Sequence, residues 1–213
     1  MLTRIKNFIK QRSGLAAIVT TSMMLITGFA GYRWHVARTC TLDQLPATIS
    51  GSMIILKTVE ARDYAPLHHM FLCAVRKGLD MPEVITFADT LAYVHQLEQR
   101  AEHSNGLLYV IVDNRNDKPI GIIELREFSP TDMGQLSCWI NEAYWGEGRI
   151  QEAIRLASSI YFRHYHNQES YVAHVRLTNQ HCYKALKKAG LAEIGYFYED
   201  GKPTRYIMEM RRG

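Results

Sequence analysis

Residues 139–148 read WINEAYWGEG and join a strand to a helix through a glycine-containing turn. The first two of these residues end a strand expected over residues 134–140, and an amphipathic helix follows the second glycine. Gly146 and Gly148 let the backbone turn sharply and present its N–H groups, while the helix start adds a partial positive charge. The turn is therefore a candidate for holding a pyrophosphate, although a tight structural connection explains it equally simply. Its spacing fits neither a Walker loop nor a dinucleotide fingerprint, which argues against nucleotide hydrolysis and nicotinamide binding.

A second informative stretch spans residues 179–191 and reads NQHCYKALKKAGL, directly after a strand expected over residues 171–177. Asn179 is a favourable N-cap for the helix that should follow, and capping alone would explain its presence. The helix carries three lysines: Lys184, Lys187 and Lys188. They form either a solvated helix face or a place for the phosphates of a bulky anionic cofactor.

Outward from these two stretches, apolar residues recur first at strand spacing and then at helix spacing. Strands are expected over residues 53–59, 107–112 and 120–125, helices over about 62–75 and 86–103, and two closing strands around the Asp200-Gly201 turn. The order strand-helix-helix-strand-strand-strand-helix-strand-helix-strand-strand predicts an α/β (α+β) domain, in which a mixed sheet has helices on both faces.

The first 39 residues are expected to lie outside that domain. Residues 1–12 carry four basic residues and no acid, and residues 14–32 contain no charged side chain. An apolar helix of this length can cross a bilayer, so we expect a single-pass transmembrane anchor. A cleaved signal peptide and an apolar helix that packs on the domain are the alternatives. Residues 40–52 read as a linker and residues 53–213 as the globular domain.

Composition excludes several classes of protein. The formal net charge of +4 is mild, and no long basic stripe with interleaved aromatic residues is present, so no nucleic-acid partner is expected. Cys40, Cys73, Cys138 and Cys182 are scattered, without a CxxC pair or a Cys/His cluster at zinc-finger spacing. We therefore expect reduced cysteines and no metal site.

Taken together in this order, the two stretches resemble the GNAT superfamily of N-acetyltransferases, specifically its ribosomal-protein N-terminal acetyltransferase-like branch. Residues 139–148 look like that branch's strand and Tyr-Trp-Gly-x-Gly turn, and residues 179–191 are similar to its Asn-led helix that ends at a glycine. The likeness covers about residues 53–210. It implies a GNAT-type acyl-CoA N-acyltransferase fold, with acetyl-CoA as co-substrate. The acetyl group would pass directly to an amine, without a metal or a covalent enzyme intermediate.

The resemblance also assigns residues to the cofactor. Ile140 and Asn141 would pair with the pantetheine arm where two strands splay apart, Asn179 would contact the cofactor, and Lys184 would offer a positive charge. The backbone amides expected to hold the pyrophosphate belong to Gly146, Glu147, Gly148, Arg149 and Ile150.

Departures from the pattern of the branch affect the expected chemistry. Ile150 replaces a small residue and crowds the phosphate turn, the turn at residues 146–150 that is expected to hold the pyrophosphate. Leu186 stands where many members carry a tyrosine that acts as general acid. Cys182 replaces the usual serine, so it is either a donor that protonates the leaving thiolate or a packed, half-buried residue. Glu124 and His174 are the candidates for the base that deprotonates the amine. An exposed edge charge and a packed strand histidine are their respective structural alternatives.

These observations predict an N-acetyltransferase whose acceptor is a protein or peptide amine, with the α-amino group of a protein N-terminus as the narrower option and a small-molecule amine as a separate one. The alternative is a membrane-tethered GNAT-like module that binds a cofactor or partner without turnover. Because the domain needs acetyl-CoA, we expect it to face the cytoplasm, anchored through residues 14–32, or to be cytoplasmic without an anchor. The heavier positive flank before the apolar segment instead favours a cytoplasmic N-terminus, which conflicts with that expectation.

Overall fold

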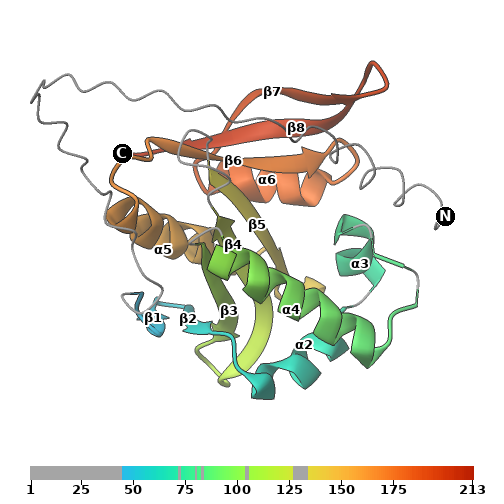
Figure 1. The fold of residues 1–213 in the computed structure, drawn as a ribbon, viewed down its shortest axis with the longest axis vertical. Helices are drawn as coiled ribbons and strands as arrows, with labels where there is room; N and C mark the ends of the chain where they lie inside the picture. The colour runs from blue at the N-terminus through green and yellow to red at the C-terminus, as the bar shows by residue number, and fades with distance from the viewer. Residues whose placement is uncertain (1–44, 72, 80, 83, 104–105, 127–133) are drawn as a thin grey trace, which may run out of the picture. The chain divides into compact units, whose positions relative to one another are not determined.

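The computed structural model describes residues 45–71, 73–79, 81–82, 84–103, 106–126 and 134–213, which belong to one compact unit spanning Arg38–Gly213 (Figure 1). Its strands are β1 (Thr48–Ser50), β2 (Ile54–Thr58), β3 (Leu107–Asp113), β4 (Lys118–Arg126), β5 (Gly134–Ile140), β6 (Ser170–Arg176), β7 (Ala192–Glu199) and β8 (Lys202–Arg211). Its helices are α2 (Tyr64–Met70), α3 (Cys73–Leu79), α4 (Phe87–His103), α5 (Arg149–His164) and α6 (Gln180–Lys188), with 3-10 turns η2 (Ala61–Asp63) and η3 (Glu142–Tyr144).

The strands form one eight-stranded sheet in the order β1-β2-β3-β4-β5-β6-β8-β7. Within the described residues, β5 and β6 run parallel and every other neighbouring pair is antiparallel. The predicted mixed sheet is thus confirmed. Its parallel pair requires a long crossover, and α5 supplies it.

Successive side chains of each strand point to opposite faces of the sheet, so the core has two layers. Tyr109 and Ile111 of β3 belong to a cluster with residues of α5 and α6, whereas Val110 and Val112 belong to a cluster with α2, α3 and α4. Helices therefore cover both faces of the sheet, as the pattern predicted (Figure 1).

Two helical predictions needed correction. The helix expected over residues 62–75 is divided, because Phe71 leaves the helical conformation with φ −72° and ψ 62° after α2, and α3 begins at Cys73. Thr86 and Asp89, whose spacing predicts a helix cap, form it before α4, with the Thr86 N–H donating to the Asp89 carboxylate at 2.8 Å. The helix spacing of Phe87, Leu91, Val94 and Leu97 predicts a buried stripe, but Phe87 is 44% exposed. Val94 and Leu97 are buried as predicted, together with Thr90 and Ala101.

The N-terminal expectations fall largely outside the described residues. The hydrophobic helix and the apolar segment over residues 14–32 lie there, so the anchor stays a prediction. In the part of the chain that the structure describes, no helix is both long and apolar enough to cross a membrane. Thr48–Ser50, within the linker expected over residues 40–52, form strand β1 instead. Ile49 explains this, because it pairs with Leu56 and packs against the core cluster of α5 and α6.

Candidate active site

The sheet opens between its two parallel strands. β5 and β6 are paired at residues 134–135 and 171–172, and their remaining residues continue without pairing to each other. The two strands point in clearly different directions in Figure 1. The hydrogen-bonding ladder of the sheet therefore has a gap, which widens toward the C-terminal ends of β5 and β6.

Main-chain groups of β5 point into this gap. Asn141 donates its N–H to the Ile120 carbonyl at 2.8 Å, which continues the antiparallel ladder between β4 and β5. Because alternate residues of an antiparallel strand face the same neighbour, the N–H and carbonyl groups of Cys138 and Ile140 point away from β4. The edge of β5 thus offers backbone donors and acceptors to an extended ligand.

Two residues were expected to pair with pantetheine, Ile140 and Asn141. They differ in whether their main-chain groups face the gap. Asn141 is engaged within its own turn, because its carbonyl accepts from the Tyr144 N–H at 2.9 Å and its Oδ1 accepts from the Ala143 N–H at 2.9 Å. Ile140 faces the gap, and its carbonyl accepts from Trp145 Nε1 at 2.9 Å. The side chain of Asn141 therefore shapes the turn η3 rather than the gap.

The turn after η3 has the geometry that its glycines predicted. Gly146 and Gly148 adopt φ 85° and φ 86°, in the left-handed region that other residues rarely occupy. Gly148 is the N-cap of α5, and the first intrahelical bond is donated by the Glu152 N–H to its carbonyl at 3.0 Å. The amides of residues 149–151 precede that bond and lie at the positive end of the helix dipole. This end of α5 is suited to a phosphate or diphosphate.

Side chains hold the turn in place. Arg149 is buried, pairs with Glu147 and lies 3.5 Å from Asp113 through its Nε. Its guanidinium lies 5.3 Å from the centre of the Tyr144 ring. The Arg149 guanidinium also holds the pKa of Glu147 below its usual value. Of Arg149, only the main chain is thus available to a cofactor, while its side chain fastens the turn to the end of β3.

A buried carboxylate ties the same helix to the other end of the sheet. Glu152, in the first turn of α5, is 2% exposed. It accepts hydrogen bonds from the Ser52 N–H and hydroxyl at 2.6 and 2.7 Å, and from the Met53 and Ile54 N–H groups at 2.8 and 3.2 Å. Burial raises the pKa of Glu152, but these four donors outweigh it and the pKa is lowered. The residues joined lie about a hundred positions apart in the chain, so this contact sets the position of the phosphate turn on the sheet.

The remaining expected cofactor residues surround the gap in different ways. Ile150 is half-buried and packs against the core cluster of α5 and α6, so it leaves its amide rather than its side chain to a ligand. Asn179 caps α6 by accepting from the Cys182 N–H at 3.1 Å. A Cβ added to Gly78 of α3 would lie 3.2 Å from Asn179 Nδ2, so α3 closely approaches this cap. Lys184 is exposed on α6.

Glu124 is not the exposed edge charge that was one reading of the sequence. It is 1% exposed on β4 and lies 3.4 Å from Arg100 Nη2 of α4 and 3.3 Å from Arg126 Nη1. Burial raises the pKa of Glu124, against the opposing effect of both arginines. In the described part of the chain its Oε1 has no hydrogen-bond partner. The two guanidinium groups anchor Oε2, while burial makes the carboxylate a better proton acceptor than an exposed one.

His174 lies on the same face of the sheet as Glu124, on the other wall of the gap. Its neighbours Ala173 and Val175 belong to the α5/α6 cluster, so alternation turns His174 to the opposite face. Its ring centre lies 5.5 Å from that of Phe197. Burial lowers the pKa of His174, and the nearby positive charge of Arg205 lowers it further. The imidazole is therefore neutral at pH 7, as a proton acceptor must be.

Cys182 lies on the other side of the gap, where it and Cys138 pack against the α5/α6 cluster. Burial raises the pKa of Cys182 to about 11. The thiol keeps its proton at neutral pH, but it is a weaker acid than an ordinary thiol, whose pKa is about 8.5. Cys182 can therefore donate a hydrogen bond to a thiolate more readily than it can give up a proton.

The sequence did not single out every residue at the gap. Ser137 pairs with Glu124 in the ladder, and Trp145 lies against His181 with 5.1 Å between ring centres. The available signal for Ser137 was its position two residues before Trp139, on the same face of the strand, whereas nothing local indicated the Trp145–His181 contact. Among the described residues no group of His, Cys, Asp and Glu could hold a metal ion.

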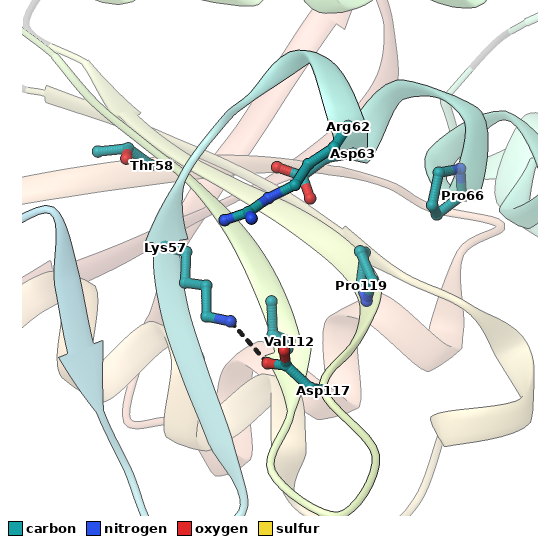
Figure 2. A pocket seen from close by; sticks show the side chains of 8 residues that line it. All are labelled: Lys57, Thr58, Arg62, Asp63, Pro66, Val112, Asp117 and Pro119. Carbon is teal, nitrogen blue, oxygen red and sulfur yellow. Dashed lines mark hydrogen bonds and ion pairs between the residues drawn. The ribbon is translucent and has the colours of Figure 1, made fainter.

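A separate surface pocket of about 210 Å³ lies between β2, the start of α2 and the turn that joins β3 to β4 (Figure 2). Its basic side chains are neutralised locally, Lys57 by Asp117 at 2.6 Å and Arg62 by Glu60 at 3.0 Å. None of the residues expected for catalysis or cofactor binding lines it. The gap between β5 and β6 is therefore the better candidate for the active site.

Comparisons with known proteins agree with this geometry. Residues 53–192 match the family model described as an acetyltransferase (GNAT) domain. A search of curated protein sequences gave no match.

Solved structures share the fold at low sequence identity. RimL, a ribosomal-protein alpha-N-acetyltransferase solved with coenzyme A, is 15% identical with a TM-score of 0.64, covering 77% of this chain and 97% of its own. An acetyltransferase from Salmonella typhimurium that modifies the N-terminal serine of a 50S ribosomal protein is 14% identical with a TM-score of 0.63, covering 76% and 97%. The microcin C7 self-immunity acetyltransferase MccE, solved with acetyl-CoA and AMP, is 14% identical with a TM-score of 0.61, covering 79% and 98%.

The family match covers the gap, the phosphate turn and the start of α6. An acetyl-CoA-dependent transfer needs an edge for the pantetheine arm, a site for the diphosphate and an opening for the amine. The gap offers the edge and the opening, and the phosphate turn offers the site for the diphosphate. The chain belongs to the GNAT acetyltransferase family and is an N-acetyltransferase that uses acetyl-CoA.

Proposed function

We propose that the acceptor is the amine of a peptide or protein, with an α-amino group as the preferred form, and that it reaches the thioester from the α2/α4 face of the gap. The observation that carries this proposal is the division of the gap into two sides. The phosphate turn, Cys138 and Cys182 lie with α5 and α6, whereas Glu124, Ser137 and His174 face the opposite side. The acceptor class also rests on the neighbours named for modifying protein N-termini.

In the proposed reaction the neutral amine attacks the thioester carbonyl directly. The N–C bond forms, the C–S bond breaks, and the thiolate of coenzyme A leaves and takes up a proton. Main-chain N–H groups of Cys138 or Ile140 that point into the gap are placed to stabilise the tetrahedral oxyanion. His174 accepts the proton of the amine, directly or through water.

The test is an acceptor screen with the full-length chain. Peptides with free and blocked α-amino groups, a lysine-containing blocked peptide and small amines are incubated with acetyl-CoA, and the products are weighed. We expect a product heavier by about 42 Da, the mass of one added acetyl group, from peptides with a free α-amino group. Acetylation of small amines alone would overturn the acceptor class, and acetylation of the blocked lysine peptide would move the site to a side chain.

Replacing His174 by glutamine should lower kcat/KM by about 100-fold, since a positioned general base commonly contributes this much. Because the pKa of His174 is lowered from its ordinary 6.5, the wild-type imidazole is neutral at pH 7 and becomes protonated as the pH falls through a value below 6.5. The wild-type rate should therefore fall on that acid side, and H174Q should lose this limb. The measurement is the pH profile of kcat/KM.

Glu124→Gln is the comparison for this profile. Its carboxylate is held by Arg100 and Arg126, so we expect the acid limb to survive in E124Q even if the rate falls. Loss of the limb in E124Q and its survival in H174Q would assign the base to Glu124 instead.

A further inference from the structure

An aromatic contact closes the open end of the gap. The rings of Trp145 and His181 lie with 5.1 Å between their centres and 31° between their planes. Trp145 follows the wall formed by β5, and His181 lies in the first turn of α6, which follows the wall formed by β6. Because these two walls diverge, the contact bridges the widest part of the gap.

Trp145 also occupies a main-chain acceptor inside the gap. Its indole Nε1 donates to the Ile140 carbonyl at 2.9 Å. That carbonyl points away from β4, toward the space that an extended ligand would enter. An amide N–H of a pantetheine arm along β5 would need the same acceptor.

The surroundings of Trp145 suggest a side chain that can move. It is 38% exposed, and its partner ring, His181, is exposed as well. The hydrogen bond to the Ile140 carbonyl and the contact with His181 hold the indole at the surface of the molecule.

We propose that Trp145 is a placeholder for the cofactor: its indole N–H occupies the Ile140 carbonyl in the free protein, and the pantetheine arm of acetyl-CoA displaces it. The contact with His181 keeps the ring across the gap until the cofactor enters. Trp145 thereby becomes a residue that sets cofactor affinity by competition, a role that rests on the proposed cofactor position along β5.

Trp145→Phe separates competition from direct contact, because phenylalanine keeps an aromatic ring beside His181 but has no N–H. If Trp145 competes, W145F binds acetyl-CoA with a Kd about 2- to 10-fold lower, the equivalent of one hydrogen bond no longer broken. The Kd is measured by calorimetry on the full-length chain. An unchanged or higher Kd overturns the proposal, the latter because it would make Trp145 a direct cofactor contact.

A second variant and a control complete the test. His181→Ala removes the ring contact and leaves the indole N–H, so acetyl-CoA should associate faster in stopped-flow tryptophan fluorescence; unchanged or slower association argues against the bridge. Tyr198→Phe removes a polar group from another exposed ring, on β7, and should leave the Kd as in the wild type. Failure of the wild type itself to bind acetyl-CoA would remove the proposed cofactor site, whereas binding that is indifferent to W145F removes the placeholder alone.

Discussion

Replacing Gly148 by valine should weaken acetyl-CoA binding by about 100-fold or more, the equivalent of losing two hydrogen bonds to a charged phosphate. Gly148 has φ 86° as the N-cap of α5, and a β-branched residue resists this conformation. A backbone change at residue 148 that relieves this strain would move the amides of residues 149–151 away from the diphosphate. Calorimetric titration of acetyl-CoA into wild type and G148V measures the effect.

The matched control is Gly201→Val. Gly201 has a similar φ of 74°, lies in the β7–β8 turn, and has no atom within 4 Å of an added Cβ. Both variants should lose about 1–3 kcal/mol of folding free energy to backbone strain, but G201V should bind acetyl-CoA like the wild type. A folded G148V that binds within about threefold of the wild type would show that the turn does not hold the diphosphate.

Glu152→Gln should lower the free energy of unfolding by about 3 kcal/mol, the largest expected effect on stability. The carboxylate accepts four hydrogen bonds from Ser52, Met53 and Ile54. A glutamine amide turns an NH₂ group toward some of these donors, which are then left buried and unsatisfied. Urea unfolding at pH 7, monitored by circular dichroism, gives the difference.

Because the pKa of Glu152 is lowered, the difference in stability between the wild type and E152Q should depend on pH. Its stabilising contribution is fully present above the ordinary carboxyl pKa of 4.5 and is lost as the pH falls through the lower folded value. The difference between wild type and E152Q should therefore shrink below pH 4.5. Glu199→Gln is the control, because its contact with Arg205 at 3.4 Å is half exposed and should contribute less than about 1 kcal/mol. Equal losses in both variants would contradict the anchoring role of Glu152.

Local patterns were sufficient for the elements and for the phosphate turn. The glycines at 146 and 148 predicted a sharp turn at the start of a helix, and both adopt the positive φ that such a turn uses. Asn179 predicted a cap, and its Oδ1 accepts from the Cys182 N–H. These features depend on residues within one turn of each other, so spacing along the chain carries the necessary information.

Local patterns were not sufficient where a residue's partners come from distant segments of the chain. Phe87 has the right spacing for the buried stripe of α4 but ends up exposed, because the rotation of α4 about its axis is set by its packing on α2 and β4. The side chain of Asn141 closes η3 and its main-chain N–H continues the ladder to Ile120, whereas its expected contact with the cofactor stays a prediction. Strand register, which decides both the direction of a side chain and the partners of its backbone, is a tertiary property.

The order of the elements other than β1 and the break between α2 and α3, the mixed sheet and the family resemblance all follow from local patterns in the sequence. Only the tertiary structure decided that Glu124 is buried between two arginines, that Glu152 joins α5 to the start of β2, and that Trp145 meets His181 across the gap. These contacts connect side chains from separate elements. Periodicity predicts which face of an element is buried, whereas packing and strand register determine which residue of another element meets it.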